Sequence, residues 1–373
     1  MRVLHINLAK RGIGRYGVLY GQALGNHPGV TARSIFDADL FEDAPVLQEQ
    51  LKRFDHVLLP WERQPKHTSL LRLAQVVRAF KPDLIHDSSG SYNRSLLLWP
   101  LLSRFGRLVV TEHDPVVHVG MQASRGERAA RWLLGHLAEH VFVHGASCQQ
   151  MLVDRGLPAT MISRIRHGHL GPIFDRGAYQ AVVRRPQEVL FFGELRPNKG
   201  FDMLPEIAAS VHQRFPDARF VVAGSSKGIA DRNAAWGERI REVLEEMQRQ
   251  PYFEVHDRFI PDEEVEFFFK RAGLALMPYR EATQSGVAMV AMPLGSVVIA
   301  TAVGDIPEVV QDGVTGYLVE PFGERVAERL VHALQHPEEV SRIRDQALAF
   351  ARTDCSWETV VATVIRTVGE KPT

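Results

Sequence analysis

Two basic residues in one short loop are the clearest candidates for chemistry in this sequence. Arg196 and Lys199 lie in the segment 193–201 (Gly-Glu-Leu-Arg-Pro-Asn-Lys-Gly-Phe), between an apolar run and a helix-like pattern. An arginine side chain forms forked hydrogen bonds with phosphate oxygens, and a lysine adds a compact positive charge. The pair could therefore hold a diphosphate, although two exposed basic residues also fit an ordinary solvated loop.

A second anion site is expected where a short helix begins. The region reads as a buried strand, a polar loop, a helix and another buried strand, over Leu274–Pro278, Tyr279–Ser285, Gly286–Leu294 and Val297–Thr301. The first backbone N–H groups of a helix are unpaired and lie at the positive end of its dipole, so they suit a phosphate. Ser285–Val287 would supply these groups, and Gly286 would let a ligand approach the backbone closely. Taken alone, the stretch fits an ordinary strand-loop-helix unit equally well.

Histidines follow two neighbouring predicted strands of the first half. His113 and Asp114 come after the apolar run Leu108–Thr111, and His86 ends the preceding strand in the same way. Open α/β sheets place their sites at the carboxyl ends of the strands. A histidine there could act as a hydrogen-bond partner or as a proton carrier near neutral pH. A packed or surface histidine fits equally well, and the repetition on two strands favours a site.

Two glycines follow the first predicted strand. Gly12 and Gly14 stand at a strand-to-helix turn, where their N–H groups could approach a phosphate. The third glycine of the dinucleotide-binding spacing is absent, and no Gly-Lys-Ser/Thr sequence follows. Taken alone, a tight turn is the simpler interpretation.

These candidate residues lie between regularly alternating strand and helix patterns. In the first half the predicted strands are Arg2–Leu8, Val30–Phe36, His56–Pro60, Asp83–His86, Leu108–Thr111, His140–His144 and Ile162–Arg166. In the second half they are Val189–Phe192, Arg219–Ala223, Phe253–His256, Leu274–Pro278, Val297–Thr301 and Gly316–Val319. Helix-like stripes such as Ser69–Phe80 and Arg239–Gln248 lie between them. The alternation predicts an α/β fold with parallel sheets that are covered on both faces.

The length of the chain and a pause in the pattern predict two domains. At 373 residues the chain is too long for most single cores. The alternation pauses at a polar, basic segment near 180–188 and then starts again. Two doubly wound domains would place a ligand in a cleft between the carboxyl ends of their sheets. The last helix-like stretch, Trp357–Thr367, has no strand after it.

The net charge of zero hides an uneven distribution. Residues 1–186 contain 24 Lys and Arg against 15 Asp and Glu, which leaves 20 against 29 of the 44 and 44 for the remainder. Twelve of the 16 histidines also lie in the first half. A basic half suits an anionic partner, although each half could simply solvate its own surface. No Lys/Arg run with interleaved aromatic residues is present, so nucleic acid is not expected as a partner.

Targeting and redox signals favour a cytoplasmic protein. The start of the chain, Met1–Leu8, is a short apolar run before Lys10 and Arg11, and it reads as a strand rather than as a signal peptide. No apolar stretch approaches the length that crosses a bilayer. Cys148 and Cys355 are far apart and outside metal-ligand spacing, so we expect a reducing compartment and no zinc site.

The motifs carry more information together than singly. In chain order they are Gly12-Ile-Gly-Arg-Tyr16, Thr111-Glu-His-Asp114, Gly193-x-x-Arg-x-x-Lys-Gly200, Gln284-Ser-Gly-Val287, Gly304-x-x-Pro-Glu-Val-Val310 and Asp312-Gly-x-Thr-Gly316. In this order they resemble the motifs of the retaining family-4 glycosyltransferases, which have the GT-B fold. The resemblance covers nearly the whole chain. It implies two Rossmann-like domains facing across a cleft: an N-terminal acceptor-binding domain (1–182 plus 356–373, the last helix returning to it) and a C-terminal nucleotide-sugar domain (187–355).

Carried over residue by residue, the resemblance implies a donor site. Arg196 and Lys199 would bind the diphosphate of the donor. The backbone of Ser285–Val287, that is Ser285, Gly286 and Val287, would cap the distal phosphate, with Gln284 beside it. Gly14 would complete the site from the other domain.

The resemblance also implies roles around the sugar. His113 would lie beside the transferred sugar as a hydrogen-bond partner, and Glu281 is the second candidate catalytic residue. The backbone at Ile260 would contact the base. His86 and Asp114 are assigned to the acceptor side. Neither a metal nor another cofactor is implied.

The sequence departs from the family pattern at the catalytic loop. Many members carry two glutamates there, seven residues apart, whereas Val290 stands at the second of these positions here. Glu281 is also five residues before Gly286 instead of three. The loop resembles a Gln-Ser-Gly-Val variant, which leaves the ribose contact unassigned. Glu194 stands where many relatives have arginine, so Arg196 remains the expected phosphate ligand.

The resemblance implies transfer of a sugar from a nucleoside-diphosphate sugar to an acceptor hydroxyl, with the anomeric configuration kept, in polysaccharide or glycoconjugate synthesis. The acceptor would be a sugar or a lipid-linked sugar, and the basic first half would suit peripheral contact with the inner face of the cytoplasmic membrane. Two alternatives stay open: a nucleotide-sugar epimerase or phosphorylase of the same architecture, and an inactive nucleotide-sugar-binding subunit. The nucleotide, the sugar and the acceptor are not specified by the sequence.

Overall fold

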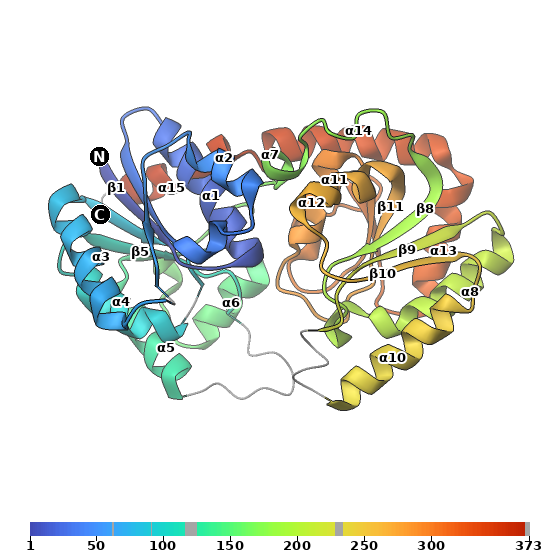
Figure 1. Cartoon of the computed structure of the whole chain (residues 1–373), viewed down its shortest axis with the longest axis horizontal. Coiled ribbons are helices and arrows are strands. Elements are labelled where there is room, and N and C mark those ends of the chain that lie inside the picture. Colours follow the sequence, from blue (N-terminus) through green and yellow to red (C-terminus); the bar gives the residue numbers. More distant parts are fainter. Residues whose placement is uncertain (62, 91, 116–124, 228–233, 370–373) are drawn as a thin grey trace. The chain divides into compact units, whose positions relative to one another are not determined.

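Two compact units make up the structure. The computed structural model describes the chain except for residues 62, 91, 116–124, 228–233 and 370–373. Unit 1 comprises Met1–Gly168 and Cys355–Thr373, and unit 2 comprises His169–Asp354, within the described part (Figure 1).

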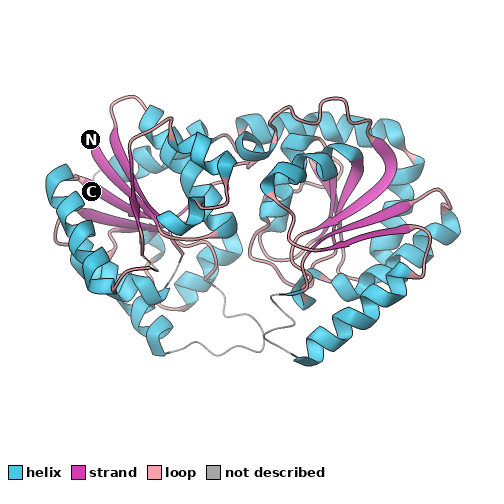
Figure 2. Ribbon diagram, viewed as in Figure 1, coloured by secondary structure: helices cyan, strands magenta, loops and turns pink. Residues whose placement is uncertain are grey.

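Unit 1 is built on a seven-stranded sheet in which every pair of neighbouring strands is parallel. The strands are β1 (Arg2–Asn7), β2 (Thr31–Asp37), β3 (His56–Leu59), β4 (Leu84–Asp87), β5 (Arg107–Thr111), β6 (His140–Val143) and β7 (Ile162–Arg164). Their order in the sheet is β3-β2-β1-β4-β5-β6-β7. The apolar runs of the sequence therefore form central strands, which are buried because helices cover both faces of the sheet (Figure 2).

The helices of unit 1 connect these strands. They are α1 (Arg11–Asn26), α2 (Pro45–Leu51), α3 (Lys66–Phe80), α4 (Tyr92–Leu102), α5 (Arg125–Leu137), α6 (Ala146–Asp154) and α15 (Trp357–Gly369), with short 3-10 turns η1 (Ala38–Phe41) and η2 (Ala159–Met161). The last helix, α15, packs beside α1, where the rings of Trp357 and Tyr16 meet at 4.9 Å (Figure 1). The expected return of the last helix to the first domain is thus confirmed.

Unit 2 repeats this architecture with six strands, again all parallel. The strands are β8 (Arg185–Phe192), β9 (Arg219–Gly224), β10 (Phe253–Asp257), β11 (Ala272–Met277), β12 (Val297–Thr301) and β13 (Gly316–Val319). The helices and turns are α7 (Gly171–Phe174), η3 (Pro197–Lys199), η4 (Phe201–Met203), α8 (Leu204–Arg214), α10 (Ala234–Gln248), α11 (Asp262–Arg271), α12 (Gly286–Leu294), η5 (Ile306–Glu308), α13 (Gly323–Gln335) and α14 (Pro337–Thr353). The predicted α/β fold with two doubly wound domains is confirmed.

The strand order locates the crevice that each sheet offers to a ligand. In unit 2 the order is β10-β9-β8-β11-β12-β13, so the chain reverses its direction of winding between β8 and β11. In unit 1 the same reversal lies between β1 and β4. Ligands of open α/β sheets bind at the carboxyl ends of the strands beside such a reversal. The loops after β8 and β11 carry the predicted donor residues.

The segment that follows residue 168 belongs to unit 2, which corrects the predicted boundary at 182–187. The buried Glu266 of α11 accepts hydrogen bonds from the backbone N–H groups of residues 176–178, at 3.0 to 3.3 Å. Arg184 donates to the carbonyls of Phe269, Ala272 and Leu294 at 3.3, 2.7 and 2.9 Å. These bonds fix 169–184 on unit 2, and a polar composition alone did not reveal them.

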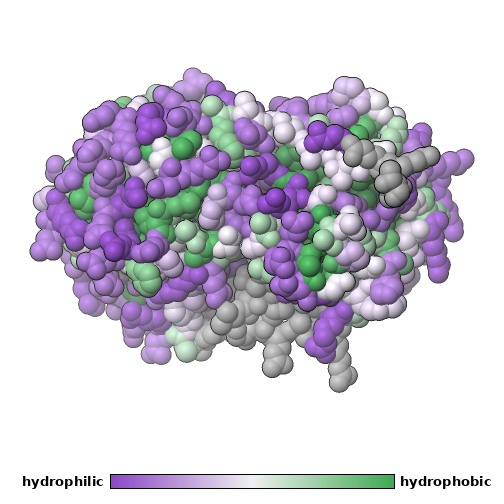
Figure 3. All heavy atoms as spheres, turned by 180° about the vertical axis from the view of Figure 1, so that it is seen from behind, coloured by the Kyte–Doolittle hydropathy of each residue, from purple (hydrophilic) through white to green (hydrophobic). Residues whose placement is uncertain are grey.

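Hydrophilic residues cover most of the face drawn in Figure 3, with hydrophobic residues between them. Large apolar side chains that are more than half exposed include Leu71, Trp132, Val183, Phe259 and Phe322. Among the described helices, none is both long enough and apolar enough to cross a bilayer.

Candidate functional site

Three residues of unit 2 converge beside the reversal point of its sheet. Gly193 follows β8 with a positive φ of 110°, a conformation that favours glycine. A side-chain carbon at position 193 would lie 2.7 Å from Lys199 Nζ and 4.0 Å from Val287 Cγ2. The glycine therefore leaves room beside the lysine ammonium and the first turn of α12. The structure brings together Lys199 and the predicted phosphate-binding helix start.

A second glycine lets the two loops approach each other. Gly200 also has a positive φ, 68°, and a side-chain carbon there would lie 2.0 Å from the carbonyl oxygen of Pro278. Arg280, just after β11, forms a two-pronged ion pair with Asp202 at 2.6 and 2.9 Å. The Arg280 N–H also donates to the Asn198 carbonyl at 2.8 Å. The loop after β11 is thus tied to the loop that carries Lys199.

The first turn of α12 has the geometry of a capped helix start. Ser285 is the N-cap residue, and its hydroxyl accepts a hydrogen bond from the Val287 N–H at 3.2 Å. Gly286 is exposed, and a side-chain carbon there would have Leu170 as its nearest contact, at 4.0 Å. Because Ser285 already accepts from Val287, the exposed backbone at Gly286 is the part of this turn that an anion can approach most directly.

The other predicted residues of this loop differ in burial. Glu281 is exposed, and its N–H donates to the Asn198 carbonyl at 3.3 Å. Gln284 is half-buried between Thr283 and Ser285. The loop therefore presents the Glu281 carboxylate to solvent, and among the described residues no contact of that side chain identifies a partner for it.

Arg196 is engaged within its own loop. Its guanidinium forms an ion pair with Glu194, and the Arg196 side chain is 37% exposed. A phosphate that binds Arg196 would have to displace the Glu194 carboxylate or share the guanidinium with it. Lys199 Nζ lies 5.6 Å from the ring centroid of Tyr279, so the apolar ring lines one side of the lysine.

Ile260 lies in the loop after β10 and is 6% exposed. Two residues earlier, the backbone N–H of Arg258 donates to the Gly224 carbonyl at 3.0 Å, and the Arg258 side chain pairs with Glu264. Asp257, at the end of β10, accepts hydrogen bonds from the N–H and hydroxyl of Ser226, both at 2.8 Å. The carboxyl ends of β9 and β10 are therefore tied together beside Ile260.

In unit 1, Gly14 occupies the first turn of α1. A side-chain carbon at this position would lie 2.7 Å from both the Ala9 carbonyl oxygen and the Leu40 side chain. At Gly12, the described part of the chain places no atom within 4 Å of the corresponding position, apart from the glycine's neighbours along its own helix. Close packing within unit 1 thus requires a glycine at position 14, whether or not a ligand binds there.

His113 is enclosed by unit 1 and is only 1% exposed. Its Nε2 lies 3.1 Å from the Ser88 carbonyl oxygen, and its Nδ1 lies 3.1 Å from His144 Nε2. A direct hydrogen bond from this ring to a sugar would require one of these two bonds to break. Asp114, the next residue, is half-buried.

His86 is fully buried, which does not fit the prediction that it faces an acceptor. Its Nδ1 lies 2.8 Å from the Tyr20 hydroxyl, and its Nε2 lies 2.8 Å from the Thr111 hydroxyl. Alternation along a strand places this ring between α1 and β5 rather than at the sheet edge. The prediction considered where the strand ends but not which way the side chain points.

Sequence reasoning missed most of this histidine cluster. His5 lies 2.8 Å from the Ser88 hydroxyl and is paired in register with His86 on the neighbouring strand. His144 follows β6 as His113 follows β5, and the ring of His167 lies 5.1 Å from that of His144. The excess of histidines in the first half of the sequence was the one sign of such a cluster. Which histidines lie close together depends on the order of the strands in the sheet.

Burial keeps these histidines uncharged at neutral pH. Loss of solvation lowers the pKa of His86 and of His113 to about 3, and that of His167 to about 4. It also lowers the pKa of His5 and of His144 well below the usual value. For His113 and His144, neighbouring imidazoles lower the pKa further.

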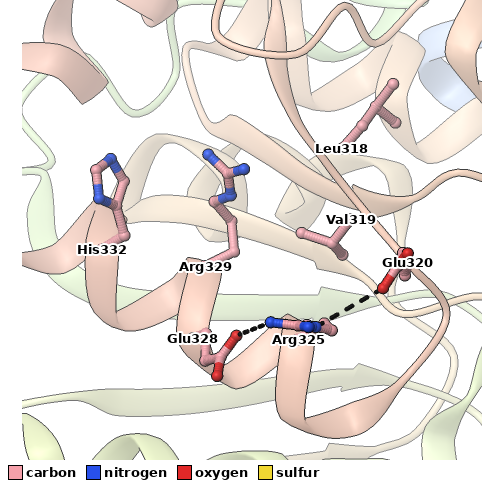
Figure 4. A pocket seen from close by; sticks show the side chains of 7 residues that line it. All are labelled: Leu318, Val319, Glu320, Arg325, Glu328, Arg329 and His332. Carbon is pink, nitrogen blue, oxygen red and sulfur yellow. Dashed lines mark hydrogen bonds and ion pairs between the residues drawn. The ribbon is translucent and has the colours of Figure 1, made fainter.

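A separate hollow lies at the far edge of the unit 2 sheet, between β13 and α13 (Figure 4). Its volume is about 470 Å³, and it is lined by Leu318, Val319, Glu320, Arg325, Glu328, Arg329 and His332. Arg325 lies between Glu328, at 3.0 Å, and Glu320, at 3.7 Å (Figure 4). Arg329 pairs with Asp312, outside the lining, at 3.7 Å. The lining residues include none of the predicted site residues.

Known proteins share both the sequence pattern and the fold. A family described as glycosyltransferase family 4 matches residues 29–169, and one described as glycosyl transferases group 1 matches residues 186–336. The two matches lie in different halves of the chain, and together they support a family-4 glycosyltransferase. The D-inositol 3-phosphate glycosyltransferase of Mycolicibacterium paratuberculosis is 29% identical over 188 residues, which are 49% of this chain and 41% of that protein. The chain thus spans about two fifths of the length of the curated relatives it matches.

Solved structures of other proteins show the same fold. HepE from Anabaena, in complex with UDP and glucose, has a TM-score of 0.74 at 17% identity, with 99% of each chain covered. The sucrose-phosphate synthase of Thermosynechococcus elongatus has a TM-score of 0.71 at 18% identity, covering 99% of this chain and 98% of that one. These likenesses establish the GT-B fold for this chain.

Proposed function

We propose that this protein transfers a sugar from a nucleoside-diphosphate sugar to an acceptor hydroxyl, with the anomeric configuration kept. The convergence of Gly193, Lys199 and the start of α12 at the reversal point of the unit 2 sheet carries the proposal. It joins a cation, a glycine that leaves space beside that cation, and a helix start, which together suit a diphosphate.

The residues of this site would act on the leaving group. Departure of a nucleoside diphosphate places negative charge on its phosphate oxygens, and fixed positive groups stabilise that charge most in a site without water. Lys199 would supply an ammonium and the exposed backbone at Gly286 an N–H group. Arg196 would supply a guanidinium by exchanging Glu194 for a phosphate oxygen.

The acceptor side of the proposal rests on the charge of the first half. Its surplus of Lys and Arg suits an acceptor that carries phosphate, or an anionic membrane surface that holds such an acceptor. We propose a role in polysaccharide or glycoconjugate synthesis in the cytoplasm, at the inner face of the membrane. Equal activity on neutral and phosphorylated acceptors of the same sugar would contradict the phosphate part of this proposal.

Ligand-induced stabilisation identifies the donor first. The full chain is heated with UDP, GDP, ADP and TDP and with their common sugar derivatives, and the melting temperature is recorded. A ligand at about 100 times its Kd adds about 2.7 kcal/mol of stability, which shifts the melting temperature by several degrees. Absence of a shift with every nucleoside diphosphate would contradict the proposal.

Replacement of the lysine then tests the assignment of the diphosphate. We expect Lys199→Ala to lower donor turnover at least tenfold, a loss of about 1.4 kcal/mol or more of transition-state stabilisation. Arg249→Ala is the matched control, because it removes an exposed cation of the same unit, in the turn just after α10. Unchanged turnover of the Lys199 variant would contradict the assignment of the diphosphate to this loop.

Product analysis separates transfer from the alternative activities. With UDP-glucose as the first donor, a transferase or a slow donor hydrolase releases UDP, whereas an epimerase changes the sugar without releasing UDP. The panel of acceptors includes D-inositol 3-phosphate, because the matched relatives are named for it. The configuration at the anomeric carbon of the product, measured by NMR, tests retention.

A further inference from the structure

Two histidines of unit 1 form a continuous hydrogen-bonded chain between two backbone carbonyls. The chain runs from the Ser88 carbonyl to His113 Nε2, at 3.1 Å, and from His113 Nδ1 to His144 Nε2, at 3.1 Å. It ends where His144 Nδ1 lies 3.3 Å from the Ile165 carbonyl oxygen. Both rings are buried, with His113 1% and His144 6% exposed.

The number of ring protons decides the direction of these bonds. Each of the three contacts needs one N–H, but two neutral imidazoles carry only two. A carbonyl oxygen can only accept, so the contact between the rings allows two arrangements: protons on both Nε2 atoms, which leave Ile165 without a ring donor, or protons on both Nδ1 atoms, which leave Ser88 without one. The first arrangement keeps the two shorter contacts, so we assign the His113 proton to Nε2, and its Nδ1 then accepts from His144 Nε2. The neutral pair therefore satisfies both 3.1 Å contacts and leaves the longer contact, His144 Nδ1 to Ile165, without a proton.

The surroundings hold this arrangement at both ends. The Asn7 amide also donates to the Ser88 carbonyl, at 2.9 Å, so that carbonyl is fixed by two donors. Tyr16 of α1 packs edge-on against the rings of His113 and His144, with centroids 4.6 and 5.4 Å away. The other titratable groups packed around the pair include the imidazoles of His86, on β4, and His167, after β7.

We propose that His144 is a positioning residue: its Nε2–H donates to Nδ1 of His113 and fixes the His113 ring against the Ser88 carbonyl. The ring in turn contacts the loop after β4 through the Ser88 carbonyl, and a side-chain carbon placed at Gly90 of the same loop would lie 3.4 Å from His113 Cδ2. His144 thus holds two loops, after β4 and after β5, at the carboxyl edge of the unit 1 sheet. The consequence for turnover rests on the proposed glycosyl transfer; the hydrogen bond itself does not.

A spectroscopic signature tests the bond in the unmodified protein. The full chain is labelled with 15N-histidine, and scalar coupling across N–H···N hydrogen bonds is measured between ring nitrogens. We expect one coupling that joins a protonated nitrogen, His144 Nε2, to an unprotonated one, His113 Nδ1. His144→Gln and His144→Phe assign the resonances, since each removes one partner. A His113 ring that carries its proton on Nδ1, or an unprotonated His144 Nε2, would overturn the proposal.

Kinetics test the positioning role. We expect His144→Phe, which keeps a ring but has no donor, to lower kcat for UDP-glucose at least about fivefold and to leave the donor KM within about twofold. His144→Gln should recover most of kcat, because a glutamine amide can donate in place of Nε2–H. His140→Phe, on the same strand but outside this chain of bonds, should match the wild type.

The outcomes separate this inference from the proposed function. A wild-type protein without activity on any nucleotide sugar would contradict the proposed function, and the coupling between the two histidines would still be tested. Equal kcat for wild type and His144→Phe, in an active and folded enzyme, would overturn the positioning role.

Discussion

The two units share one topology but bury their polar groups in opposite ways. Beneath the sheet edge of unit 1, neutral rings and hydroxyls bond to one another: His5 to Ser88 at 2.8 Å and His86 to Tyr20 at 2.8 Å. In unit 2, buried charged side chains form ion pairs, such as Arg271 with Glu188 at 2.7 Å and with Glu254 at 2.8 Å.

This difference predicts different responses to pH. A buried imidazole stays in place while it is uncharged, so acid opposes the folding of unit 1. A buried ion pair stays in place while both partners are charged, so the carboxylates of unit 2 matter only at lower pH. Two units with the same type of fold should therefore lose their stability at different pH values.

Acid should destabilise unit 1 selectively, and this is the largest effect that we expect. Among the described residues of unit 1, five buried histidines have pKa values far below the usual 6.5 because of burial, and burial also lowers the pKa of the half-buried His140. The unfolded chain binds more protons than the folded one below pH 6.5, so stability is full above that pH and falls as pH decreases. Each such histidine costs about 1.2 kcal/mol between pH 7 and 5.5, or about 6 kcal/mol for all five.

Hydrogen exchange of the full chain, corrected for the intrinsic rate at each pH, measures this loss of stability in each unit separately. Strands β1, β4 and β6 report on unit 1, and strands β8, β11 and β12 report on unit 2. Unit 2 should keep its protection over this range, since the hydrogen bond with Arg258 holds the pKa of the Glu264 carboxyl below the usual 4.5. Stability from such carboxylates is lost only as pH falls below about 4.5. Burial raises the pKa of the Glu188 carboxyl, and a raised carboxyl pKa does not oppose folding as pH falls. Parallel loss of protection in both sheets would contradict the comparison.

Arg271→Met should have the next largest effect, and in unit 2. The substitution leaves Glu188, whose side chain is 3% exposed, without its buried cation. Removal of one partner of a buried pair costs about 3–5 kcal/mol. Urea denaturation at pH 7 measures the loss. The double variant Arg271→Met/Glu188→Gln should recover part of it, whereas an equal or larger loss would show that packing rather than charge dominates.

His86→Gln should make unit 1 less sensitive to acid. The substitution removes one of the five titrating groups, so the loss of stability between pH 7 and 5.5 should shrink by about 1.2 kcal/mol. A glutamine amide can still bond to Tyr20 and Thr111. Urea midpoints of variant and wild type at both pH values give the difference. An unchanged acid loss would mean that His86 does not titrate on unfolding as we expect.

The smallest expected effect concerns the helix start in unit 2. Ser285 caps α12 through its side chain, whereas α1 in unit 1 begins after Lys10 without a side-chain cap. Ser285→Ala should therefore cost about 1 kcal/mol, seen as faster hydrogen exchange in the first turn of α12. Lys10→Ala should leave the first turn of α1 unchanged. Equal changes in hydrogen exchange at the first turns of α12 and α1 would contradict the proposed difference in side-chain capping between the two helices.

The sequence predicted the elements better than the directions of side chains. The bounds of α12 and β12 agree residue for residue, because apolar runs between polar loops define buried helices and strands clearly. The loops with Lys199 and Gly286 could be placed because strands of a parallel sheet end at one edge. Whether His86 points into the sheet or out of it depends on strand order and packing, which no single stretch of sequence contains.

The same reasoning explains the displaced domain boundary. A polar, basic segment looks like a linker in one dimension, yet Glu266 and Arg184 bond it to unit 2 through backbone groups. Such contacts carry almost no sequence signal, because any residue can supply the N–H or the carbonyl.

That boundary sets a rule for exchanging halves between glycosyltransferases of this fold. A chimaera joined at 182–187 would separate 169–182 from the α11 residues that bind its backbone, and would leave Glu266 facing foreign main chain. A junction between residues 168 and 169, with 355–373 taken from the same parent as 1–168, keeps every bond described above within one parent. Recombination libraries should therefore transplant the first unit as two separate pieces of sequence.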